Sequence, residues 1–111
     1  MVEKITDNIK KLYEITETFK TYKLKNGGSY RVMQFSWKKQ FELIKWLSKR
    51  HSFGLTFGYS AEWIVMTDFA DEDYETTYGH ESFSQALAGL LIELWQNLSE
   101  TEKSEVKGIL K

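Results

Sequence analysis

SFSQALAGLLIELWQNL, residues 82–98, is the most apolar stretch of the chain. A helix turning by about 100° per residue places six large apolar side chains of this stretch on one face: Phe83, Leu87, Leu90, Leu91, Leu94 and Leu98. Ala88, Ile92 and Trp95 widen the apolar arc to roughly 200° of the helix circumference. We therefore expect a helix that begins at a capping box of Ser82 and Gln85, with a sheet on one side and a second helix or second subunit on the other.

The rest of the chain alternates between strand and helix patterns. Two strands flank the turn Asn26-Gly27-Gly28, and two more are expected over residues 53–60 and 63–69. A short third strand at residues 74–78 would complete that sheet. Helices are expected over three further ranges: residues 2–17, residues 37–50 after an N-cap at Ser36, and a last helix after a capping box of Ser99 and Glu102. The predicted order α-β-β-α-β-β-(β)-α-α makes residues 1–111 a single α+β domain with an antiparallel sheet.

The composition excludes several classes of chemistry. The 111 residues include no cysteine, so the chain has no disulfide, thiolate metal site or cysteine nucleophile. It has only two histidines and no H-E-x-x-H pattern, and we expect neither a metal nor another cofactor. The N-terminus has no apolar signal-peptide region and no stretch approaches the length of a membrane span. These features predict a cytoplasmic protein that does not enter a membrane.

Charge is divided unevenly along the chain. Residues 1–60 contain 12 Lys and Arg but 5 Asp and Glu, whereas residues 61–111 contain 3 and 11. This division predicts either a charged surface for a partner or two halves that interleave and neutralise each other.

No arrangement of residues indicates catalysis. His80 and Glu81 are the only adjacent histidine and carboxylate, but neighbours in sequence seldom face the same substrate. The acidic stretch at residues 68–75 lacks the glycine and the final glutamate of an EF-hand loop. We therefore expect a protein that is not an enzyme.

Two groups of residues are candidates for binding a partner. Trp46 is expected on the polar side of its helix near Lys39 and Arg50, and tryptophan with basic neighbours is typical of interface hot spots. The alternative is that another element of the chain covers Trp46. The second group lies in the acidic stretch: Asp71, Glu72 and Asp73.

Residues 53–66, FGLTFGYSAEWIVM, form an aromatic-rich predicted hairpin in the middle of the chain. Gly79-His80-Glu81 then precedes the Ala- and Leu-rich helix containing Gln85-Ala86-Leu87-Ala88. In these features residues 37–98 resemble small phage proteins of the ABA-sandwich type. The resemblance implies a phage or mobile-element origin and supplies no catalytic residue.

These observations favour a small non-enzymatic protein that binds another protein and thereby modulates or inhibits a host protein. The alternative is a nucleic-acid-binding accessory protein that uses the basic N-terminal half, where lysines and aromatic residues are mixed. Self-association as a homodimer is a further expectation, because a second subunit could cover the apolar arc of residues 82–98.

Overall fold

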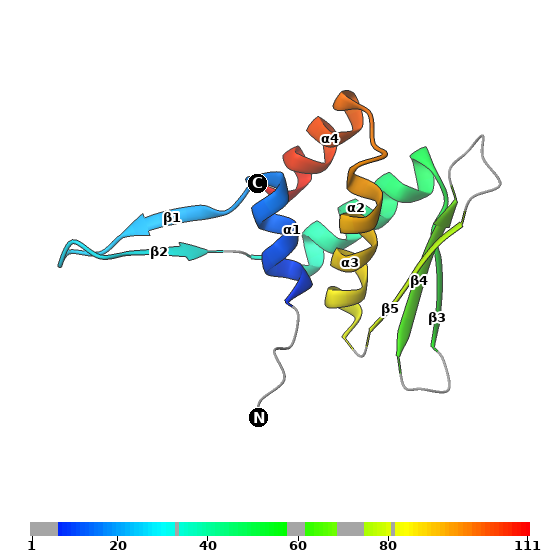
Figure 1. Cartoon of the computed structure of the whole chain (residues 1–111), viewed down its shortest axis with the longest axis horizontal. Coiled ribbons are helices and arrows are strands. Elements are labelled where there is room, and N and C mark those ends of the chain that lie inside the picture. The colour runs from blue at the N-terminus through cyan, green and yellow to red at the C-terminus, as the bar shows by residue number, and fades with distance from the viewer. Residues whose placement is uncertain (1–6, 33, 58–61, 69–74, 81) are drawn as a thin grey trace.

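A computed structural model describes residues 7–32, 34–57, 62–68, 75–80 and 82–111 (Figure 1). The elements follow one another in this order: α1 (Asn8–Thr16), β1 (Lys20–Lys23), β2 (Ser29–Val32), α2 (Trp37–Arg50), β3 (Gly54–Phe57), β4 (Trp63–Asp68), β5 (Glu75–His80), α3 (Phe83–Trp95) and α4 (Glu100–Leu110). This succession confirms the predicted α+β class and the predicted order of elements, including the third strand before α3.

Helix α3 is the centre of the fold. It packs against α1 on one side and against β4 and β5 on the other, as its wide apolar arc predicted (Figure 1). Seven of its residues are buried: Ala86, Leu87, Ala88, Gly89, Leu90, Leu91 and Leu94. The helix therefore contributes more buried residues to the hydrophobic core than any other element.

Gln85 joins α3 to the start of α1. Ser82 caps α3 by accepting from the Gln85 N–H at 3.5 Å, but the predicted reciprocal capping box is wrong. The Gln85 amide instead accepts from the Ile9 N–H and donates to Asp7 Oδ1, each at 3.1 Å. Asp7 is the N-cap of α1, and the bond from Gln85 is the largest cause that lowers the pKa of its carboxyl group. One side chain thus fixes where α1 begins and where it lies on α3.

The larger sheet has the order β3-β4-β5 with antiparallel pairing, so β4 is the central strand. Phe57 pairs with Trp63 and Leu55 pairs with Val65, which places these four side chains on one face. Helix α3 packs on this face over β4 and β5. Strand β3 lies at the edge of the sheet, beyond the part that α3 covers (Figure 1).

Strands β1 and β2 form a separate hairpin that points away from the helices (Figure 1). Its turn is built as predicted: Gly27 has a φ of 91°, which glycine adopts without strain. The Asn26 side chain accepts from the Gly28 N–H at 3.1 Å and closes the loop. All four residues of β1 are exposed, so the hairpin adds little to the core.

Helix α4 packs against the C-terminal part of α2. Its predicted capping box is confirmed, since the Ser99 and Glu102 side chains each accept from the other residue's backbone N–H. Arg50 pairs with Glu105 at 2.6 Å, and His51 pairs with Glu102 at 2.8 Å. At this junction the basic and acidic halves of the sequence interleave. Among the helices of the described residues, none is long and apolar enough to cross a membrane.

Candidate functional site

Helix α2 has two apolar faces with different surroundings. Leu43, Trp46 and Leu47 are buried in the core, whereas Trp37 and Phe41 remain 65% and 58% exposed. Helical spacing predicts Trp37 and Phe41 on the buried stripe of this helix and Trp46 on its polar side. The structure shows the reverse, so the spacing was wrong on these three residues. The reason is that α4 packs against the side of α2 that carries Trp46, and helical periodicity cannot reveal which side a later helix will cover.

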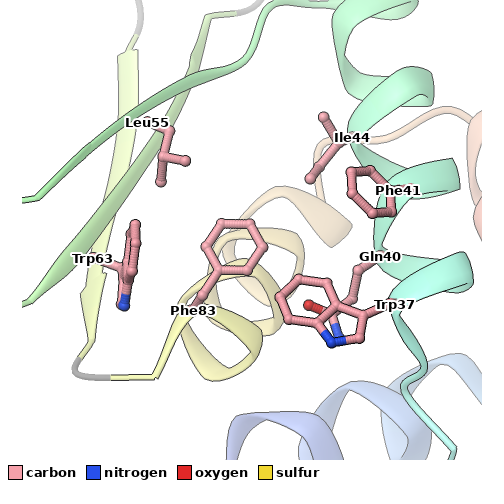
Figure 2. Close-up of a pocket in the computed structure, with 7 residues that line it drawn as sticks. All are labelled: Trp37, Gln40, Phe41, Ile44, Leu55, Trp63 and Phe83. Atoms are coloured by element: carbon pink, nitrogen blue, oxygen red, sulfur yellow. The ribbon is translucent and has the colours of Figure 1, made fainter.

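The exposed face of α2 forms one wall of an apolar groove with a volume of about 270 Å³. Figure 2 shows side chains of α2 on one side, side chains of β3 and β4 on the other, and Phe83 at the start of α3 between them. The groove is lined by Trp37, Gln40, Phe41, Ile44, Leu55, Trp63 and Phe83. We call it the aromatic groove.

The aromatic rings of the groove are in contact from one wall to the other, and Phe57, next to the groove on β3, continues the series. The Trp37 ring stacks on Phe83 with 6.2 Å between ring centroids and 16° between planes. Phe83 meets Trp63 edge to face at 5.9 Å, and Trp63 meets Phe57 edge to face at 5.1 Å. On α2, Phe41 lies 6.2 Å from Trp37. Five rings thus form a continuous surface, and such exposed apolar surfaces mark sites of interaction.

Gln40 is the polar residue among those that line the groove, and its amide is already engaged. It donates to the Phe35 carbonyl at 2.9 Å and accepts from the Ser84 hydroxyl at 3.1 Å. These bonds connect the start of α2 to the start of α3 and so keep the rings of Trp37 and Phe83 next to each other. The groove is therefore suited to binding apolar side chains rather than to proton transfer or nucleophilic attack.

The two walls of the groove differ in charge. Lys38 and Lys45 lie three residues before and four residues after Phe41, so both are its neighbours on the surface of α2. Glu42 lies beyond them and pairs with Lys45 at 3.7 Å. The opposite wall includes β3, and residues 52–61 contain no charged side chain. The rim is therefore basic on the α2 side and uncharged on the β3 side.

The predicted patch of Lys39, Trp46 and Arg50 does not form one exposed surface. Trp46 is only 7% exposed and contacts His51 edge to face at 5.8 Å. Arg50 is paired with Glu105, whereas Lys39 lies eleven residues earlier, about 16 Å along the helix. The alternative expectation, that another element covers Trp46, is the correct one, because α4 packs against this side of α2.

Lys39 is a residue of α2, and its side chain lies at the base of the β1–β2 hairpin. Its ammonium group lies 5.9 Å from the centre of the Tyr13 ring, a cation–π distance. Burial lowers the pKa of Lys39, and the nearby charge of Lys20 on β1 lowers it further. Burial likewise raises the pKa of the Tyr13 hydroxyl to about 12. Lys20 and Lys39 thus lie close together at the base of the hairpin. The segment that contains both of them, residues 18–41, has no Asp or Glu.

Asp71, Glu72 and Asp73, the other predicted partner-binding residues, lie outside the described residues. His80 serves a local structural role, since its Nδ1 accepts from the Ser82 N–H at 3.0 Å where α3 begins. Within the described part of the chain, no cluster of three or more His, Asp or Glu residues could hold a metal ion.

Comparisons of the chain with family models, with curated proteins and with solved structures found no match. The resemblance to phage proteins of the ABA-sandwich type stays a prediction. Function has to be inferred from the groove and from the hairpin themselves.

Sequence reasoning missed the aromatic groove, although one signal was present. The apolar residues of α2 span roughly 220° of its circumference, from Trp46 to Phe41. A helix at the periphery of a small domain seldom buries so wide an arc. The width of this apolar arc indicated that the chain does not cover all of it. The sequence did not show which part remains exposed.

Proposed function

We propose that the protein acts by binding another protein through the aromatic groove, and not by catalysis. The observation that carries this proposal is the continuous series of five contacting rings from Phe41 to Phe57. Four of these rings are exposed, and Phe83 between them is partly buried. Aromatic side chains dominate the energetics of protein interfaces, and a concave apolar surface with a polar rim is the usual form of such a site. Modulation of a host protein, which the resemblance to phage proteins implies, is one form this binding takes.

The test is affinity capture from a nuclease-treated lysate with three matched baits. The wild-type protein is compared with a double variant, Trp37→Ala and Phe41→Ser, and with Tyr22→Ala as the control. Tyr22 is also an exposed aromatic residue, but it lies on the hairpin outside the groove. We expect a protein captured by the wild type and by Tyr22→Ala to be lost with the double variant. Equal capture by all three baits would contradict the proposal.

Nucleic-acid binding is the second candidate, and the β1–β2 hairpin favours it. Lys20, Lys23 and Lys25 are exposed on an arm that projects from the body (Figure 1). A two-stranded ribbon fits the major groove of duplex DNA, and lysines bind its phosphates.

The hairpin hypothesis is tested by mobility shift of duplex DNA at several salt concentrations. Replacing the three lysines with glutamine should weaken binding and reduce the slope of log affinity against log salt by roughly three, about one per lost phosphate contact. Lys10→Gln with Lys11→Gln on α1 serves as the control. Absence of binding by the wild type at low salt would exclude this candidate.

A further inference from the structure

We infer that the occupant of the aromatic groove is an amphipathic helix of a separate protein, with carboxylates along the flank that faces Lys38 and Lys45. This inference rests on the proposed function and names the chemistry of the partner. It follows from the width of the sheet, from the walls of the groove and from the charge of its rim.

The part of the sheet that α3 leaves uncovered is one strand wide, so an incoming helix would rest on β3 and on the exposed face of α2 together. Neighbouring strands lie about 4.8 Å apart, and a helix with its side chains is about 10–12 Å wide. Helix α3 therefore covers β5 and β4 but not β3, which leaves Leu55 and Phe57 48% and 58% exposed. A second helix packs about 8–10 Å from the first, which would place it over β3 and between the sheet and α2.

The lining of the groove matches the apolar face of a helix. Its walls offer aromatic and branched aliphatic side chains, and Gln40, its polar lining residue, is engaged in hydrogen bonds. An incoming helix presents apolar residues at positions i, i+3 or i+4, and i+7, which lie along one stripe. Leu, Phe or Met at these positions would rest on Phe83 between Trp37 and Trp63.

The rim sets the charge of the partner. Lys38 and Lys45 lie beside Phe41 on the surface of α2 by helical spacing. The side chain of Lys45 is 74% exposed and also pairs with Glu42 at 3.7 Å, an exposed contact that holds the lysine only weakly. The β3 wall contributes no charge, so the electrostatic preference acts on one flank of the incoming helix only. Asp or Glu on that flank would meet both lysines, whereas Lys or Arg there would be repelled.

A second copy of the chain does not supply such a helix among the described residues. The apolar arc of α3 is buried, and Glu102 and Glu105 of α4 are paired with His51 and Arg50. Since the described helices of a second copy do not fit, we place the occupant on another protein.

The experiment is a selection from two displayed peptide libraries, one of helix-forming 18-residue peptides with a randomised surface and one of extended 8-residue peptides. The wild-type protein is the bait, and binders to the double variant Trp37→Ala and Phe41→Ser are first removed. We expect enrichment of helical peptides that have apolar residues at i, i+3 or i+4, and i+7 and carboxylates on one flank. Enrichment of extended peptides instead would show strand addition at the β3 edge and overturn the inference.

The charge preference is then measured with the enriched helical peptide by fluorescence anisotropy. Lys38→Glu with Lys45→Glu should raise its Kd about tenfold, and a peptide with Lys in place of its carboxylates should regain affinity for that variant. Lys10→Glu with Lys11→Glu on α1 is the matched control and should leave the Kd within about twofold. Equal binding of acidic and basic peptides by the wild-type protein would overturn the inference that the partner helix has carboxylates on one flank.

Two further outcomes separate this inference from the proposed function. If no peptide is enriched while lysate capture still depends on Trp37 and Phe41, the helical occupant is wrong and the binding function stands. If neither experiment depends on these residues, both fail. Sedimentation of the wild type showing a dimer that the double variant abolishes would make a second copy the occupant and overturn the inference.

Discussion

Helices α2 and α3 have apolar arcs of similar width, but the chain covers the arc of α3 much more fully than that of α2. The arc of α3 lies between α1 and the strands β4 and β5. On α2, the side with Trp46 is buried and the side with Trp37 and Phe41 faces the aromatic groove. The width of an apolar arc thus predicts that a helix needs cover, but the cover can come from outside the chain.

The largest effect is expected at Trp46, on the covered side of α2. Trp46→Ala should lower the free energy of unfolding by about 3–5 kcal/mol, because it leaves a cavity in the core. Trp46→Phe should cost clearly less, since the buried Trp46 Nε1 has no hydrogen-bond partner among the described residues and phenylalanine removes this unsatisfied donor. Urea unfolding measures both changes. A cost below about 1 kcal/mol for Trp46→Ala would contradict the burial of this side of α2.

The second effect concerns the covered arc of α3. Leu90 is fully buried, and Leu90→Ala should lower the free energy of unfolding by about 2–4 kcal/mol. Leu55→Ala is the matched variant on the uncovered strand β3, where half of the side chain is already in water. Its cost should be below about 1 kcal/mol. Similar costs for the two variants in the same urea titration would contradict the difference between covered and uncovered surfaces.

A third, smaller effect tests how α1 is held on α3. Asp7→Ala removes the N-cap of α1 and the bond from Gln85, and should cost about 1 kcal/mol at pH 7. The lowered pKa of Asp7 means that its carboxylate contributes stability that is fully present above its unfolded pKa of about 3.9. That contribution is lost as the pH falls through the still lower folded pKa.

The measurement for Asp7 is the difference in unfolding free energy between wild type and Asp7→Ala, from pH 7 down to pH 2.5. The difference should shrink below about pH 4. Ser36→Ala removes the N-cap of α2, whose hydroxyl does not titrate, so its cost should not follow this pH dependence. A cost of Asp7→Ala that stays constant over the whole range would contradict the role assigned to the carboxylate.

The smallest effect on stability is expected in the groove. Phe41→Ser should change the free energy of unfolding by about 0.5 kcal/mol or less, because the ring is mostly in water. The same substitution should nevertheless reduce binding of a groove partner by about tenfold or more, since the partner buries the ring. Paired unfolding and binding measurements on Phe41→Ser check both statements. A large loss of stability would show that the groove belongs to the core.

The sequence alone predicted the order of elements because each element has local signals. Ser36 and Ser99 cap helices at the predicted positions, and Gly27 forms the expected turn. These signals depend on neighbours within four residues, so they can be recognised without knowing the fold.

The candidate site could not be predicted in the same way, because it depends on contacts between distant segments. Trp46 and Phe41 lie on different sides of α2, and only the position of α4, fifty residues later, decides which is buried. Gln85 is a single residue whose long-range contact could not be predicted either. Its position suggested a local capping box, but its amide binds a segment 78 residues away.

The link from Gln85 to Asp7 has a consequence for how the chain folds during its synthesis. Helix α1 is made before α3. Helix α3 covers Leu12 of α1, and its Gln85 side chain completes the hydrogen bonds at the start of α1, but Gln85 is made 78 residues after Asp7. At about 5–20 residues per second, the ribosome needs roughly 4–15 s to reach Gln85. During this time α1 can contact residues 34–39 through Tyr13, but its side that carries Leu12 has no α3 surface to pack on. Helix α1 therefore completes its native packing only after α3 has been made, long after its own synthesis.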